Sequence, residues 1–253
     1  MISNFTFVNC VPTVVIGQPE QTGKSSTLWV ITVLHEHFHQ IQQSQPDYYK
    51  AVQNLDLSGG DESGMWMLDY PFPYDSVEIG TLFTEYQHAL AEALAGTRAA
   101  NDSTADSEID AFGAVSNSGT FSDRVDAFLG VRSRLEAALS PADFRYLSFQ
   151  IWQEGVSRYT EHRIAALAKD VHTPSPNFAA APDFLPYEHA AQLLEMALET
   201  ALSENELADA RRVSFYAIGA AEAHLLDILN PGWRSRYFDE KFDIGGFFGE
   251  GER

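Results

Sequence analysis

The sequence predicts a mainly α-helical fold, and three observations support this prediction. Apolar residues recur at helical spacing through most of the chain after residue 25, and Pro-, Gly- and Ser-rich stretches separate the helical segments. Ser140 and Pro141 stand together where a long helical pattern begins, and Pro is favoured in the first turn of a helix. Hydrophobic residues make up 45% of the 253 residues, which is enough for a buried core. We therefore expect one domain that spans residues 1–253.

The start of the chain is the exception to the helical pattern. Residues 5–8 (FTFV) and 13–16 (TVVI) are short runs of aromatic and β-branched residues, which are typical of strands. We expect them to form a small N-terminal β edge. A loop rich in Gly, Pro and Gln then leads to a helix over residues 26–43, where Ser26 is a candidate N-cap and Pro46 discourages continuation.

The rest of the chain is predicted to alternate helices with loops. A polar stretch of small residues at 101–120 is predicted to be a loop. The aromatic stretch 233–248 is expected to pack into the core, with docking on a neighbouring molecule as the alternative. Ser203 and Glu206 have the spacing of a capping box for the last helix. The predicted helices cover residues 78–99, 121–139, 140–170, 187–202 and 204–229.

The charge of the chain makes nucleic acid an unexpected partner. Asp and Glu number 36 and Lys and Arg 16, and the resulting net charge of −20 repels phosphate backbones. No run of about 18 uncharged apolar residues occurs, so we expect no membrane span. The first residues lack a basic region before an apolar one, so we expect a cytoplasmic protein, or a secreted one if the N-terminus has been trimmed. The sequence does not indicate an oligomeric state.

The strongest chemical signal is the run LHEHFHQIQ at residues 34–42. In a helix, His35 and His39 lie on one face one turn apart, so both imidazoles can bind one ion. Glu36 is next to His35 and can approach a water on that ion without occupying a coordination position. This is the HExxH pattern of zinc enzymes, in which the carboxylate accepts a proton from water. His37 points away from the pair, and we expect it to pack or to form hydrogen bonds.

A catalytic zinc ion needs a third protein ligand and one position left for water. Because the chain has a single cysteine, that ligand must be a histidine or a carboxylate. Glu154 is the leading candidate, since it lies in a long apolar helix where an unpaired carboxylate is costly to bury. Gly155 lowers the stability of that helix unless something must approach closely there. We expect Glu154 to face the ion across a helix–helix interface that Gly155 makes tight.

HEHFHQ, followed later by WQEGVSRYTE, resembles the gluzincin metallopeptidases, especially the aminopeptidase N and glycyl aminopeptidase families. The resemblance implies a zincin-like helical domain with Zn²⁺ as its cofactor, bound by His35, His39 and Glu154. It also implies that Glu36 is the general base and that the substrate is a peptide or a protein.

Two alternatives for the third ligand stay open. Glu62 follows the HExxH motif at the spacing usual in those families, but it lies in a Gly-rich loop. Glu161 lies on the same helical face as Glu154, two turns further on, and is also placed to pair with Arg158 or Arg163.

The same families use a tyrosine to stabilise the oxyanion that forms when water adds to a carbonyl group. Tyr70, Tyr74 and Tyr216 are the candidates for that role. Asp69 is a candidate for orienting a ligating imidazole, a task that carboxylates often perform around metal sites.

The sequence therefore predicts a zinc-dependent hydrolase, most plainly a peptidase. The alternative from another class is a non-catalytic helical protein, with a structural or absent metal site, that binds a protein partner. A position left open for water separates the two, because structural zinc sites are closed by protein ligands.

Overall fold

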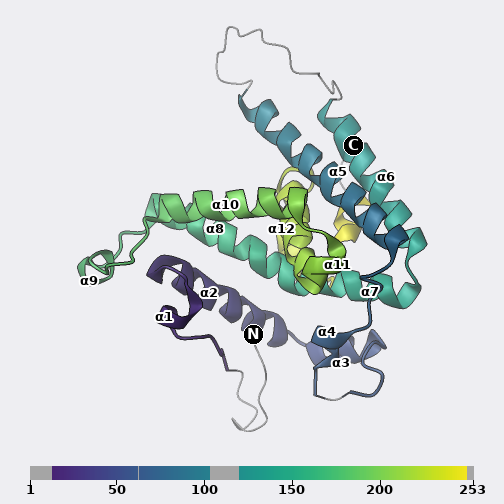
Figure 1. Ribbon diagram of the computed structural model, residues 1–253, viewed down its shortest axis with the longest axis horizontal. Coiled ribbons are helices and arrows are strands. Elements are labelled where there is room, and N and C mark those ends of the chain that lie inside the picture. Colours follow the sequence, from purple (N-terminus) through teal and green to yellow (C-terminus); the bar gives the residue numbers. More distant parts are fainter. Residues whose placement is uncertain (1–12, 62, 103–119, 250–253) are drawn as a thin grey trace.

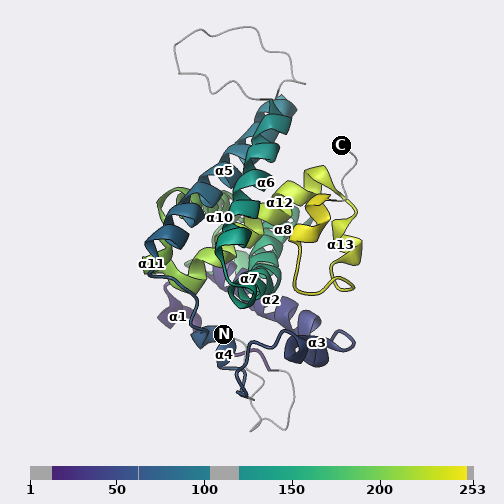
Figure 2. The same cartoon turned by 90° about the vertical axis from the view of Figure 1, so that its right-hand side faces the viewer.

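The computed structural model describes residues 13–61, 63–102 and 120–249 (Figures 1 and 2). The fold is mainly helical, as the sequence predicts, and none of the described residues forms a β-strand. None of the helices in these ranges is both long and apolar enough to cross a membrane. The elements are α1 (Pro19–Thr22), α2 (Ser26–Gln43), α3 (Tyr48–Asn54), α4 (Trp66–Asp69), α5 (Val77–Asp102), α6 (Phe121–Ala138), α7 (Pro141–Gln150), η2 (Ile151–Gly155), α8 (Val156–Val171), α9 (Pro176–Ala179), α10 (Tyr187–Glu204), α11 (Leu207–Ala210), η3 (Arg211–Val213), α12 (Ser214–Leu229), α13 (Trp233–Arg236) and η4 (Gly245–Gly249).

The predicted N-terminal β edge is not supported. Residues 5–8 lie outside the described residues, and residues 13–16 contain one β-bridge residue, Val14, but no strand. The chain is tied to a helix directly after this segment, because the indole Nε1 of Trp29 in α2 donates a hydrogen bond to the Gly17 carbonyl at 2.8 Å. A β-like run of four residues forms a strand only where a neighbouring strand supplies hydrogen bonds.

The helix that carries the HExxH motif has the predicted bounds, but its cap differs. Ser25 is the N-cap, and its hydroxyl accepts a hydrogen bond from the Leu28 amide. Ser26, the predicted cap, lies in the first turn and donates through its hydroxyl to Asp183 at 2.6 Å. The Asp183 carboxylate also accepts from the Ser26 amide at 2.9 Å, so it helps to cap α2 from a distant loop.

The predicted capping box at Ser203 and Glu206 is wrong. Helix α10 continues to Glu204, and the Ser203 hydroxyl donates back to the Glu199 carbonyl at 2.9 Å. The predicted helix over 204–229 is also divided, because Arg211 has a φ of 47° and ends α11. The chain changes direction there before α12 begins.

Helix α8 lies at the centre of the site-bearing half of the molecule (Figure 1). Helix α10 packs along one side of α8 and α2 along another, while α12 contacts both α8 and η2. Helices α5 and α6 form a pair that projects from this group in both views (Figures 1 and 2). Most of the buried apolar side chains form one large cluster, and a smaller cluster of Ile31, Ala165 and Ala190 lies among α2, α8 and α10.

The C-terminal aromatic stretch packs into this cluster, which confirms the prediction for residues 233–248. Its side chains Trp233, Tyr237, Phe242, Ile244, Phe247 and Phe248 are all buried. Trp152 stacks on the ring of Tyr237 with centroids 4.6 Å apart, so the C-terminal segment supports the helix that carries Glu154.

The predicted long helix over 140–170 is continuous, but it contains one π-helical turn. Helices α7 and α8 are joined by η2, which includes both Glu154 and Gly155. Such turns are rare inside α-helices and are frequent at functional sites. Gly155 does allow a close approach, although the partner is Gly219 of α12 rather than α2. A Cβ added to Gly155 would lie 2.4 Å from the Gly219 Cα.

Replacing Gly219 with alanine is expected to destabilise the fold by about 1–3 kcal/mol. The new Cβ would lie 2.6 Å from the Gly155 Cα and 2.7 Å from the Ile151 carbonyl oxygen, and backbone atoms cannot move away as a flexible side chain can. Gly130→Ala is the matched control, because a Cβ there meets nothing within 4 Å and a helical alanine is favoured. Urea denaturation measures both; an unchanged midpoint for Gly219→Ala would contradict the close packing.

Candidate metal centre

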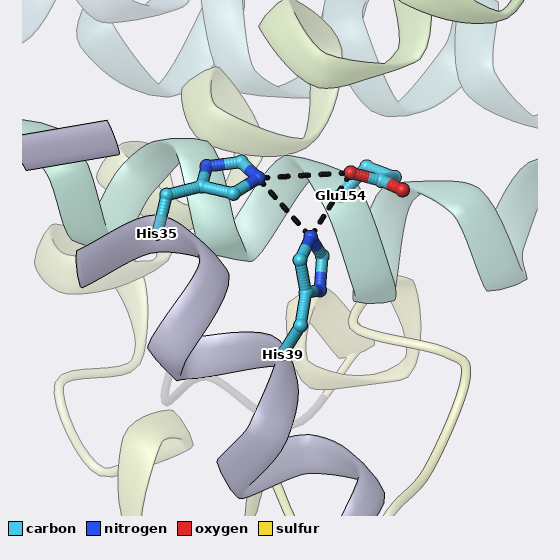
Figure 3. A group of neighbouring side chains, drawn as sticks. All are labelled: His35, His39 and Glu154. Atoms are coloured by element: carbon cyan, nitrogen blue, oxygen red, sulfur yellow. Dashed lines mark hydrogen bonds and ion pairs between the residues drawn. The ribbon is translucent and has the colours of Figure 1, made fainter. Parts of the chain in front are cut away.

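Three side chains converge on one point between α2 and η2 (Figure 3). His35 and His39 project from consecutive turns of α2, and both rings point toward the carboxylate of Glu154. The two Nε2 atoms are 3.1 Å apart, and Glu154 Oε2 lies 3.2 Å from Nε2 of His39 and 3.7 Å from Nε2 of His35. These separations compare with about 3.4 Å between ligand atoms around a tetrahedral zinc ion, given bonds of about 2.1 Å.

The hydrogen bonds around His39 determine which of its nitrogens carries the proton. Its Nδ1 lies 2.7 Å from Oε1 of Gln42, whose amide nitrogen donates to the Gln153 carbonyl and the Tyr237 hydroxyl. The Gln42 oxygen must therefore accept from Nδ1. Ser157 Oγ lies 3.2 Å from Nδ1 and also acts as an acceptor, because its hydroxyl donates to the Gln153 carbonyl. Nδ1 of His39 therefore carries a proton, and in the neutral ring the lone pair is on Nε2.

A carboxylate orients His35 in the same way. Glu161 Oε1 lies 2.7 Å from Nδ1 of His35, and Oε2 accepts from Arg158 Nη1 at 2.6 Å. Burial alone would raise the pKa of Glu161, but the hydrogen bond from His35 and the charge of Arg158 outweigh it and lower that pKa. At this distance an ionised Glu161 favours a proton on Nδ1, although the two groups are not aligned as a regular hydrogen bond. In neutral His35 the lone pair is then on Nε2, which faces inward.

Two imidazole lone pairs and a carboxylate oxygen thus face one another. Three acceptors at these distances repel unless a cation or a proton lies among them. Burial lowers the pKa of His35, but the hydrogen bonds and charges of Glu154 and Glu161 outweigh burial and raise it to about 9. Burial would raise the pKa of Glu154, yet the charge of His39 and the hydrogen bonds of both imidazoles hold it well below its usual value.

The cluster opens into a cavity of about 340 Å³ that several predicted residues line. Glu36, next to His35, is buried and lies in the cavity wall. Tyr216 of α12 also lines it; its ring is nearly parallel to that of His35, with centroids 6.4 Å apart. Arg212 donates to the Tyr216 hydroxyl at 2.6 Å. Its guanidinium also lies 3.6 Å from Glu154 Oε1.

Other candidates from the sequence lie elsewhere. Tyr70 donates to Asp143 at 3.0 Å, and Tyr74 is buried against Phe215, so neither lines the cavity. Asp69 is exposed at the end of α4 and does not orient an imidazole. His37 is exposed and pairs with a nearby glutamine, which confirms the prediction that it forms hydrogen bonds. Glu62 lies outside the described residues.

Sequence reasoning missed Gln42, Ser157 and Arg212, and it assigned Glu161 only to the metal or to arginine. Gln42 lies one turn from His39, which is a local signal, but its bonds to Gln153 and Tyr237 join distant parts of the chain. Ser157 approaches His39 from 118 positions away, which no local pattern indicates. Arg212 and Tyr216 are spaced i, i+4 on the helical pattern of RRVSFY, which is the one signal that pairs them in advance.

The effect of zinc on thermal stability is expected to grow as the pH rises from 6.5 to 9. In the chelated protein, the raised pKa of His35 gives stability that is complete below 6.5 and is lost as pH rises through about 9. Zinc competes with that proton, so its binding strengthens over the same window. Calorimetry with and without zinc at fixed free metal should show the melting temperatures diverging. A zinc-induced shift that does not change with pH would contradict the assignment of His35.

Replacing Glu161 with glutamine is expected to weaken zinc binding by about 10–100-fold, because groups that orient a ligating imidazole have effects of that size. The amide oxygen of glutamine can accept a hydrogen bond from Nδ1 of His35, but it lacks the negative charge that favours a proton on that nitrogen. Competition with a chelating dye measures the affinity. Glu188→Gln, at an exposed position of α10, is the matched control and should leave the affinity unchanged.

No protein-family model, curated protein or solved structure matches this chain.

Proposed function

We propose that the protein is a zinc-dependent hydrolase of the peptidase type. In this proposal His35, His39 and Glu154 bind zinc, and Glu36 is the general base. The observation that carries it is the convergence of three acceptor atoms, 3.1 to 3.7 Å apart, from two buried histidines and one partly buried glutamate. The Nδ1 atom of His39 faces the Gln42 oxygen, and that of His35 lies 2.7 Å from the Glu161 carboxylate. Within the described part of the chain, these three side chains are the group placed to share an ion.

The donor set fits zinc better than the hard cations. Two imidazole nitrogens and one carboxylate oxygen suit zinc, whereas magnesium and calcium prefer oxygen ligands alone. Three protein ligands also leave a position for solvent, as catalytic zinc sites do. When bound, zinc lowers the pKa of water and polarises a carbonyl oxygen.

Glu36 is placed to move the proton. Its carboxylate lines the cavity one residue from a ligand, at 6% exposure, so it meets water only inside the cavity. A carboxylate there accepts a proton from the attacking water and can return it to the leaving amine. In His35 and His39, Nε2 faces the proposed ion and Nδ1 faces Glu161 or Gln42. Neither imidazole is therefore free to accept the proton of the attacking water, and Glu36 accepts it in this proposal.

Tyr216 is placed to stabilise negative charge on the substrate oxygen. Burial and the charge of Glu154 raise the pKa of Tyr216, so its hydroxyl stays protonated and can donate. Arg212 donates to the oxygen of that hydroxyl, and the phenolic proton is shared with the Glu154 carboxylate, from which it would turn to the substrate oxygen. Together they provide a donor and a positive charge on the cavity wall opposite α2.

Metal analysis combined with a peptide library tests the proposal. The purified protein should hold about one zinc per chain, and it should hydrolyse internally quenched peptides in a reaction that a chelator stops and zinc restores. Peptides are the substrates to test first because the segments HEHFHQ and WQEGVSRYTE resemble those of gluzincin metallopeptidases. Failure to bind zinc at micromolar free metal would overturn the proposal. Zinc binding without hydrolysis of peptides, esters or amides would favour the non-catalytic alternative with a structural site.

A further inference from the structure

A second cavity of about 190 Å³ adjoins the one at the metal centre. It lies among α8, α10 and α12, and two of its lining side chains, Arg158 and Tyr216, also line the first cavity. Its remaining wall contains two polar residues, His162 and Asn205, and is otherwise aliphatic, with Leu194, Ala197, Leu198, Ala201, Val213 and Ala217.

The wall between the two cavities is held rigidly. Tyr216 is nearly parallel to His35 on one side, and the guanidinium of Arg158 lies 5.8 Å from the centre of its ring. Arg158 in turn is bonded to Glu161, the carboxylate that orients His35. An occupant of the second cavity would therefore lie one side chain away from the proposed zinc ligands.

The size and the chemistry of this cavity select one kind of occupant. A cavity of about 150 Å³ lined by apolar side chains is enough to bind benzene. A volume of about 190 Å³ accordingly suits a phenyl ring or a branched aliphatic side chain. His162 also lines the cavity, but its Nδ1 is paired with His224 Nε2 at 3.2 Å. The positive charge of Arg158 repels a lysine or arginine side chain. Burial of an apolar side chain in the cavity is favoured by about 25 cal/mol per Å² of apolar surface removed from water.

We infer that this second cavity is a specificity pocket that receives an apolar side chain, of leucine or phenylalanine size, from the residue next to the scissile bond. The inference rests on the proposed hydrolase function. It adds the substrate class: peptides with a large apolar residue at that position, in preference to glycine, alanine, lysine or arginine.

Filling the pocket tests the inference. Wild-type protein should have a kcat/KM at least about 10-fold higher for phenylalanine or leucine than for alanine at one position next to the cleaved bond. Ala197→Phe, on the exposed edge of the pocket wall, should abolish that preference by lowering kcat/KM for the phenylalanine and leucine peptides. Ala127→Phe on α6 is the matched control, because that residue is exposed and does not line either cavity.

A binding measurement separates this inference from the proposed function. Saturation-transfer NMR with N-acetyl-phenylalaninamide should give a signal with the wild-type protein, with or without zinc, and none with Ala197→Phe. N-acetyl-alaninamide should give no signal with either. Binding without any hydrolysis would keep the pocket and overturn the hydrolase. Hydrolysis without side-chain preference, together with no phenylalaninamide signal, would overturn the pocket and keep the hydrolase.

Discussion

Replacing Glu36 with glutamine is expected to lower kcat/KM for peptide hydrolysis by about 10²–10⁴-fold, while the zinc content stays at one per chain. The amide has nearly the shape of the carboxylate, so the cavity wall and the packing of α2 should be preserved. It cannot accept a proton from water, and that step is the one assigned to Glu36. Zinc content by mass spectrometry and kcat/KM by fluorogenic assay are measured on the same sample.

His37→Gln is the control for this experiment, because His37 is the exposed neighbour of Glu36 on the same helix and should leave both quantities unchanged. Full activity in Glu36→Gln would show that another group accepts the proton. Loss of zinc together with activity would indicate that Glu36 is itself a ligand, which would leave no position for water.

Replacing Glu154 with glutamine is expected to lower zinc affinity by more than about 100-fold. Replacing a residue that only orients a metal ligand lowers it by about 10–100-fold, and Glu154 is itself a proposed ligand. Glutamine retains the volume beside the Gly155 and Gly219 contact, so the fold should remain. It removes the negative charge that neutralises the cation and holds the raised pKa of His35. In the metal-free variant, the pKa of His35 should accordingly fall from about 9, as NMR titration can measure.

Glu136→Gln on α6 is the control for Glu154→Gln, since that carboxylate is exposed and lies on an element without metal ligands. Wild-type affinity in a folded Glu154→Gln protein would rule out Glu154 as the third ligand. The alternatives from the sequence would then be compared as Glu62→Gln and Glu161→Gln.

The outcome at each element depends on how local its determinants are. The helix over 26–43 has the predicted bounds because its apolar spacing, its N-terminal serines and Pro46 all lie within or next to it. The predicted capping box at Ser203 does not form, because α10 continues to Glu204. Helix α10 packs against α8 and α12, and these contacts join segments that are distant in the sequence. A local preference of about 1 kcal/mol yields to such packing.

For Gly155, the predicted close contact between helices is present, but the partner helix is α12 instead of α2. Its sequence context predicted a close helix contact, and the contact exists. The partner helix is α12, because Gly219 lies against Gly155. A Cβ added to Gly155 would lie 2.4 Å from the Gly219 Cα, so only glycine fits there. Nothing within the sequence of either segment identifies the other.

The sequence by itself determined the helical fold class, the pairing of His35 with His39 and the position of Glu36, because each depends on spacing within one helix. The tertiary structure alone decided that Glu154, rather than Glu161, faces the two Nε2 atoms, and that Glu161 orients His35 instead. Of the three candidate tyrosines, it brought Tyr216 to the wall of the cavity and left Tyr70 and Tyr74 outside it. The physical reason is that these contacts join residues more than 100 positions apart, and only the packing of α2, α8 and α12 brings their side chains together.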